Sequence, residues 1–205
     1  MKPDGRALLD AIYAAPHDLA PRLVYADFLQ DRGDPRGELI TLQLQPNRTE
    51  AQLARETELV EAHSEAWIGR LAEITTWVEF ELGFLARCGL RTIPKWALRR
   101  REWATVKHVG IADHWNRDIA ALVVAPPLVS LESLRVPAEA LASLGGAMGP
   151  ARVRQLTIDG RVTAAMWTAL AATRVLAQLK VVEIVGSLEV PLAQARSSYE
   201  RVDIR

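Results

Sequence analysis

The sequence has very little of several features that mark specialised classes of protein. Cys88 is the only cysteine among the 205 residues, which excludes an intramolecular disulfide and a zinc site built on cysteines. No apolar run approaches the ~20 residues that a membrane-spanning helix needs. The opening stretch MKPDGRALLD turns acidic at once and lacks the apolar core of a secretory signal. These absences favour a cytoplasmic protein without a membrane anchor.

The usual motifs of catalysis are also missing. The chain holds no P-loop, no glycine pattern for a dinucleotide, no G-x-S-x-G and no H-E-x-x-H. His108 and His114 lie six positions apart, but the sequence offers no partners that would make them metal ligands or a general base. We therefore predict no catalytic residue, no metal ligand and no cofactor, and we expect that the protein is not an enzyme.

The charge is balanced overall but unevenly distributed. The whole chain has 25 basic and 25 acidic residues, yet residues 1–83 hold 8 Lys and Arg against 15 Asp and Glu. The remainder, 84–205, is basic by the same margin. This asymmetry predicts either two parts with different partners or two parts that attract each other.

The first eighty residues predict a helical module. Apolar residues at helical spacing indicate helices over 5–15, from about 18 to 32, from 34 to 44 and over 50–72. In the second helix we expect five apolar residues to face inward: Leu19, Leu23, Val24, Phe28 and Leu29. Gly33 suits the left-handed position that ends a helix, and Asp34 followed by Pro35 suits the start of the next one.

Residues 5–45 also carry a family resemblance. The stretch LLDAIYAAPHDLAPRLVYADFLQDRGDPRGELITLQ resembles the bacterial repeat-companion domain, whose usual pattern is a helix followed by APRLVYADWLEERGDPRGEFIRLQ. Phe28 stands where the family usually has Trp, and Leu39 where it has Phe. The resemblance implies a module that stands immediately before leucine-rich repeats, and it implies no established activity and no catalytic residue.

The carboxylates of this stretch have two interpretations. Asp27, Asp31, Asp34 and Glu38 could form a metal or hydrolase site, although their spacing does not match a calcium loop. The alternative, which we favour, is helix punctuation in which Arg22, Arg32 and Arg36 pair locally with Asp27, Asp31 and Glu38.

The second half contains a repeated pattern. L-x-x-L-x-L, with any apolar residue allowed, occurs six times at intervals of 21, 25, 22, 26 and 20 residues. These spacings are typical of leucine-rich repeats. The occurrences are Leu85–Cys88–Leu90, Val106–Val109–Ile111, Leu131–Leu134–Val136, Val153–Leu156–Ile158, Leu179–Val182–Ile184 and Tyr199–Val202–Ile204. We expect each motif to be a short strand that points its last two apolar residues inward, with helical stretches such as 139–148 and 163–177 between motifs.

The fold class predicted is therefore α/β: a short, irregular leucine-rich-repeat solenoid with parallel strands over 81–205, preceded by an all-helical repeat-companion module over 1–80. The positions where such repeats usually carry asparagine or cysteine hold other residues, namely Ile93, His114, Glu139, Arg161 and Ser187. An ordinary α/β domain with parallel strands therefore remains an alternative.

Two surfaces are candidates for binding. The segment 95–101 places Lys95 and three arginines beside Trp96, with Trp103 shortly after it, which would suit a phosphate backbone. The neutral charge of the whole chain disfavours nucleic acid. The other candidate is the concave face of the repeats, where the residues expected to contact a partner are Arg87, Lys107, His108, Arg135, Arg154, Gln155, Lys180, Glu183 and Arg201.

The function predicted from these observations is non-catalytic binding of a protein or peptide through the concave face, with the helical module as an N-terminal cap. The outward strand positions carry no Tyr, Trp or Phe, the residues that usually anchor an interface. The alternatives left open are a nucleic-acid-binding protein that uses 95–101 and, less favoured, a hydrolase that uses the acidic cluster.

Overall fold

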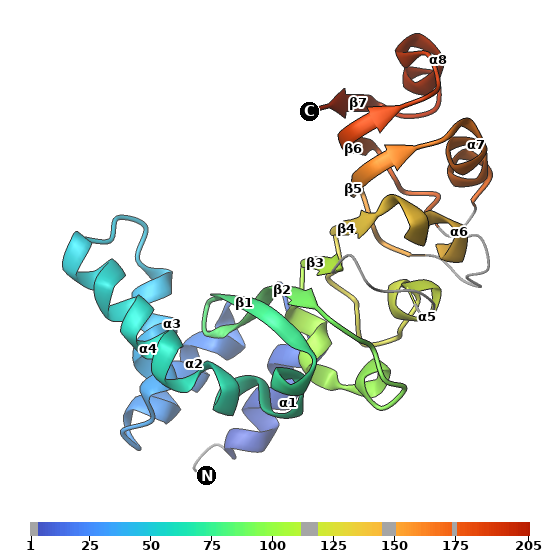
Figure 1. Ribbon diagram of the computed structural model, residues 1–205. Coiled ribbons are helices and arrows are strands. Elements are labelled where there is room, and N and C mark those ends of the chain that lie inside the picture. Colours follow the sequence, from blue (N-terminus) through green and yellow to red (C-terminus); the bar gives the residue numbers. More distant parts are fainter. Residues whose placement is uncertain (1–3, 112–118, 145–150, 174–175) are drawn as a thin grey trace. The chain divides into compact units, whose positions relative to one another are not determined.

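A computed structural model describes residues 4–111, 119–144, 151–173 and 176–205. Over these residues the chain is a mixed α/β protein with a seven-stranded sheet (Figure 1). It divides into two compact units, one made of Met1–Glu73 with Val78–Ala86 and the other of Ile74–Trp77 with Arg87–Arg205. Each unit is described by itself.

The first unit is built on helices whose ends are set by local sequence. They are α1 (Gly5–Ala14), α2 (Ala20–Gln30), α3 (Pro35–Leu44) and α4 (Glu50–Ile68), followed by the 3-10 helix η1 (Gly69–Glu73). The predicted punctuation is confirmed: Gly33 has φ 67°, and the Asp34 side chain accepts the Arg36 N–H at the start of α3. The fourth helix ends earlier than predicted, because Gly69 turns left-handed with φ 56°.

The core of this unit corrects the prediction for α2. Leu19, Leu23 and Val24 are about half exposed, whereas Tyr25, Ala26 and Leu29 are buried against α1, α3 and Phe84. The reason is that a helix buries the stripe its neighbours can cover. Here that stripe begins at Arg22 and continues at third and fourth positions, and it includes a charged residue that composition alone would place in water.

The sheet follows the chain in order. Its strands are β1 (Thr75–Glu81), β2 (Phe84–Leu90), β3 (His108–Ile111), β4 (Ser133–Pro137), β5 (Gln155–Val162), β6 (Val181–Leu188) and β7 (Arg201–Ile204), hydrogen-bonded in that sequence. Only Leu82 and Gly83 connect β1 to β2, so these strands form an antiparallel hairpin. Every pair from β2 to β7 is parallel.

The register of the parallel strands matches the repeated motif position for position. Cys88 lies opposite Val109, Val109 opposite Leu134, and Leu134 opposite Leu156, and the later strands continue the row through Val182 and Val202. Nearly all the motif side chains are buried, as expected. Two differ: Ile204 is 42% exposed on the edge strand, and Tyr199 is half-buried with its ring edge-on to Trp167.

The connections between parallel strands carry short helices, and the α-helices among them, α5 to α8, lie on one side of the strands (Figure 1). The short helices are η2 (Ala97–Arg99), η3 (Arg101–Thr105), α5 (Ile119–Val123), η4 (Ala138–Ala140), α6 (Leu141–Leu144), α7 (Ala164–Ala172) and α8 (Leu192–Arg196). The stretch expected to be helical over 139–148 is helical only to Leu144 within the described residues, and Thr163 caps α7 as its side chain accepts the Met166 N–H. Among the described residues, no helix is both long and apolar enough to cross a membrane.

Candidate functional site

The charged stretch within residues 5–45 contacts the β1–β2 hairpin through two arginines. Arg22 and Arg36 are both buried, and their guanidiniums lie 5.4 and 4.3 Å from the centre of the Phe84 ring at the start of β2. Arg36 Nε also donates a 2.8 Å hydrogen bond to the carbonyl of Gly83 in the hairpin turn. Cation–π contact with Phe84, together with the hydrogen bond of Arg36, offsets part of the cost of burying these two guanidiniums.

The local ion pairs expected here are replaced by other contacts. Arg32 lies 3.5 Å over the Phe28 ring and donates to the Phe28 carbonyl. Glu38 instead forms two hydrogen bonds, of 2.8 and 2.9 Å, with Arg55 on α4. That pairing lowers the pKa of Glu38, opposite to the raised pKa that a catalytic acid requires. Within the described part of the chain no three side chains are placed to hold a metal ion.

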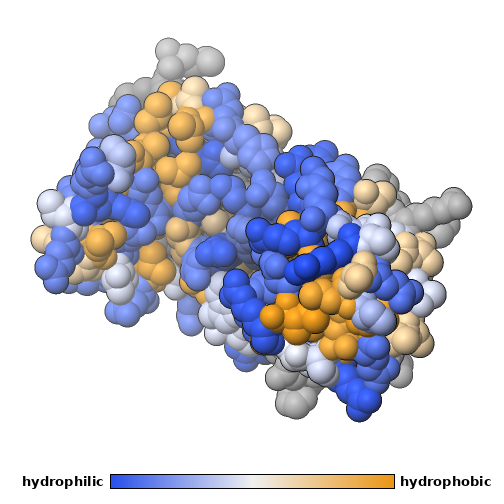
Figure 2. Space-filling model, turned by 90° about the horizontal axis from the view of Figure 1, so that it is seen from above, coloured by the Kyte–Doolittle hydropathy of each residue, from blue (hydrophilic) through white to orange (hydrophobic). Residues whose placement is uncertain are grey.

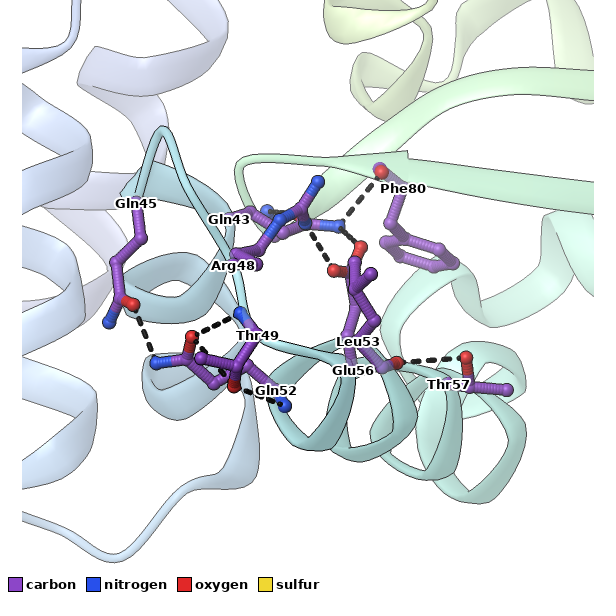
Figure 3. Close-up of polar contacts among 10 residues, drawn as sticks. Gln43, Gln45, Arg48, Thr49, Gln52, Leu53, Glu56, Thr57 and Phe80 are labelled. Carbon is purple, nitrogen blue, oxygen red and sulfur yellow. Dashed lines mark hydrogen bonds and ion pairs between the residues drawn. The ribbon is translucent and has the colours of Figure 1, made fainter.

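A second set of contacts ties the same hairpin to α3 and α4 (Figure 3). Gln43 donates to the Phe80 carbonyl at 2.9 Å and to Glu56 at 2.7 Å, and its oxygen accepts the Gly83 N–H at 2.7 Å. Arg48 forms an ion pair with Glu56. Gln43, Arg48 and Glu56 also line a pocket, together with apolar side chains such as Leu53 and Val60. Because these three polar residues already bond one another or the hairpin, we interpret their contacts as a structural clamp.

The basic segment 95–101 differs from the sequence interpretation. It forms two 3-10 helices, and Trp103 is fully buried with its indole N–H donating to the Ala97 carbonyl at 2.6 Å. Arg100 pairs with Glu102 at 2.5 Å, whereas Lys95, Arg99 and Arg101 are exposed. The segment thus keeps three surface cations but loses one of the two aromatics that stacking on a base would use.

The parallel sheet gathers the residues predicted to contact a partner. Because side chains alternate along a strand, the residues between the buried motif positions share the opposite face, which we call the polar face. Its first row, taken from the register, is Arg87, His108, Ser133, Gln155, Val181 and Arg201; its second row is Gly89, Gly110, Arg135, Thr157, Glu183 and Asp203.

The three remaining predicted residues lie just before the strands. Lys107, Arg154 and Lys180 belong to a backbone ladder that also includes Glu132. The carbonyls of these four residues accept N–H groups from the start of the next strand. Lys107 is half-buried and the other two are exposed. The structure thus places all the predicted residues on or beside one face. His114, which the sequence also singles out, falls outside the described residues.

Charges at the far end of the polar face pair with one another. Arg135 and Asp159 form two 2.7 Å hydrogen bonds between neighbouring strands. Arg205 binds Glu183 at 2.9 Å, and Arg201 binds Asp203 at 2.9 Å. The carboxylates of β5 to β7 on this face are therefore each neutralised by an arginine.

An aromatic side chain that the strand positions did not reveal lies over the other end of this face. A Cβ built on Gly89 would meet the indole nitrogen of Trp77 at 2.2 Å, and one built on Gly110 would meet the same ring at 3.5 Å. The two glycines are register partners, so the Trp77 ring lies against bare backbone of β2 and β3. The sequence signal was a pair of glycines inside strands, which often marks close approach by another group.

Apolar surface is also present away from Trp77. Val185 and Ile204, on β6 and β7, are 37% and 42% exposed. Figure 2, which looks from the side of β7 and α8, shows apolar residues gathered at the surface and framed by hydrophilic ones. Sheet-edge strands carry unpaired backbone groups on one side, so this end differs from the interior strands in both polarity and hydrogen bonding.

Comparison of the chain with protein-family models, with curated proteins and with solved structures finds no match.

Proposed function

We propose that the protein is a non-catalytic binding module of the cytoplasm that recognises a protein or peptide through the polar face. In this proposal the parallel strands and their one-sided helices form a short, irregular leucine-rich-repeat solenoid, and the helices of the first unit form a repeat-companion module that caps it. The observation that carries the proposal is the in-register array of polar side chains on one face of the sheet.

The architecture supports this reading through burial. The motif residues are interior packing, and helices α5 to α8 occupy one side of the strands, so the opposite side is left with arginine, histidine, serine and glutamine side chains. Repeats of this kind cannot bury an apolar face alone, and stacking leaves an extended surface that suits a partner.

The stretch that resembles the repeat-companion domain supports the capping role. Its arginines and Gln43 hold a hairpin whose second strand is β2, the first strand of the parallel series. This use of the stretch is structural. It explains a dense charged motif without requiring chemistry from its carboxylates.

The test selects peptides from a random display library on the whole protein and measures their binding by calorimetry. The comparison is between wild type and a variant with Arg87→Glu, Arg135→Glu and Arg154→Glu. We expect the selected peptides to bind the variant at least about tenfold more weakly, because reversed charges repel the same partner.

The variant should fold, since exposed ion pairs such as Arg135–Asp159 contribute only about 0–1 kcal/mol to stability. Circular dichroism and urea unfolding provide that control. If no peptide is enriched, or if the enriched peptides bind both proteins equally, the polar face is not the recognition surface.

A further inference from the structure

We propose that Trp77 is the anchor of the polar face and that the partner it receives is an extended acidic peptide. This inference rests on the proposed function and narrows it to one end of the face and one class of ligand. The anchor site comprises Trp77, Gly89 and Gly110 with the basic side chains of Arg87 and His108 in the adjoining row.

The placement of the Trp77 ring fits an anchor. The ring is supported from beneath by two glycines, so its position is held by backbone, yet 47% of the residue remains exposed to solvent. An apolar side chain that has little conformational freedom and a large exposed area loses little entropy when it binds. Tryptophan is accordingly the residue most enriched among those that dominate binding energy at interfaces.

The charges around the ring select an acidic ligand. Arg87 and His108 hold outward positions on β2 and β3, and none of the described outward residues on these two strands is acidic. Arg135 on the next strand, β4, is already paired with Asp159. Lys107 and Arg154 lie beside the same rows, with one carboxylate, Glu132, between them in the backbone ladder, so basic groups outnumber acidic ones here. Complementary charge would steer a chain rich in aspartate or glutamate to this end of the face.

The far end of the face argues against nucleic acid as the ligand. Asp159, Glu183 and Asp203 lie on β5 to β7, and each already binds an arginine. A phosphate backbone that crossed the strands would meet these carboxylates. Among the described residues of the face, Trp77 is the only tryptophan, tyrosine or phenylalanine that offers a ring for stacking, whereas proteins that bind single strands offer successive rings. A peptide needs one anchor and a local basic patch, which this end provides.

The experiment measures fluorescence anisotropy of a short fluorescein-labelled peptide of alternating glutamate and leucine. The proteins compared are wild type, Trp77→Ala, Trp77→Phe and Leu23→Ala. Leu23 is the matched control, because it is an equally exposed apolar residue on α2, outside the polar face. The ligands compared are this peptide, its lysine counterpart and a single-stranded oligouridylate.

We expect the glutamate peptide to bind wild type and Leu23→Ala alike and to bind Trp77→Ala at least about tenfold more weakly. Trp77→Phe should recover part of the loss, since it restores a ring. Binding should weaken as salt screens the basic side chains. The lysine peptide should bind much more weakly than the glutamate peptide.

A further variant tests the position of the ring without removing it. Gly89→Ala places a methyl group 2.2 Å from the indole nitrogen and 2.4 Å from the Thr76 hydroxyl, so it displaces the ring. Gly110→Ala adds a methyl group at ordinary contact distance. We expect affinity for the glutamate peptide to fall in Gly89→Ala and to be kept in Gly110→Ala.

Four results would overturn the inference: no binding of the glutamate peptide, equal binding by Trp77→Ala, stronger binding of the lysine peptide, or binding of the oligouridylate in place of the glutamate peptide. These results can be distinguished from a failure of the proposed function itself. If library-selected peptides lose affinity on the charge-reversed variant but bind Trp77→Ala normally, the polar face recognises a partner without this anchor.

Discussion

At the scale of single residues, the most unusual feature is the pair of buried arginines on Phe84. Burial lowers the pKa of the Arg22 guanidinium, and within the first unit its Nε makes no hydrogen bond. Arg36, by contrast, donates its Nε to the Gly83 carbonyl. The two guanidiniums share one ring but not one role. Arg36 bonds the carbonyl of buried Gly83, whereas Arg22 donates to the carbonyl of exposed Asp18, at 3.1 Å.

This difference predicts unequal effects of the same substitution. Arg36→Met should lower the free energy of unfolding by about 1–3 kcal/mol, because it removes the hydrogen bond to a buried carbonyl. Arg22→Met should cost less, and it can even stabilise, because an apolar side chain replaces a charge that is costly to bury. Urea unfolding monitored by circular dichroism measures both. Equal losses, or a larger loss for Arg22→Met, would contradict the assigned roles.

At the scale of elements, the hairpin turn joins the helices to the sheet through one glycine. Gly83 has φ 76°, its N–H and carbonyl bond Gln43 and Arg36, and a Cβ added to it would meet Ile40 at 2.2 Å. Gly33 has a similar φ of 67°, but a Cβ added there would meet nothing within 4 Å. Both glycines therefore have a backbone conformation that disfavours a side chain, but only at Gly83 would a side chain also clash with a neighbour.

Alanine at each position tests that separation. Gly33→Ala should destabilise the protein by about 1–2 kcal/mol, the cost of a left-handed conformation for a residue with a side chain. Gly83→Ala should cost clearly more, because the same conformational cost is joined by a clash with a buried isoleucine. Thermal unfolding of the two variants gives the comparison. Similar losses would contradict this, because they would mean that Ile40 moves aside to admit the added methyl group.

At the scale of the whole molecule, two weakly acidic groups link folding to pH. Burial raises the pKa of the Cys88 thiol from its ordinary 9.0 to about 12, and burial raises the pKa of Tyr199 from 10.0 to about 12. In both cases the folded chain keeps a proton that the unfolded chain has released. The unfolded state therefore binds fewer protons between the two values, and stability falls as the pH rises.

We expect the free energy of unfolding to be insensitive to these groups below pH 9.0 and to decline from there towards about pH 12. Cys88→Ala should make the decline shallower, although the smaller side chain lowers stability at every pH. Tyr199→Phe should act in the same way from pH 10.0 upward. Denaturant unfolding at a series of pH values tests this. A slope unchanged by both substitutions would show that other groups govern alkaline stability.

The sequence alone determined the features that depend on near neighbours and on periodicity. Gly33 and Asp34 punctuate helices through their own backbone and side-chain chemistry, and the spacing of the apolar motifs fixed which residues of β2 to β7 are buried and which lie opposite one another. Side chains alternate between the two faces of a strand, so a prediction of which residues are buried also predicts which residues form the polar face.

Only the tertiary structure decided the contacts that cross long stretches of chain. Arg36 and Gly83, 47 positions apart, meet because the hairpin packs on the helices. Phe84 of that hairpin joins the core that buries one stripe of α2, and Leu23 lies outside that stripe. Trp77 of the hairpin lies over Gly89 and Gly110 on the polar face, and both glycines occupy a position that the repeated motif leaves unspecified. Such contacts depend on how whole elements pack, and neither residue spacing nor local propensity encodes that packing.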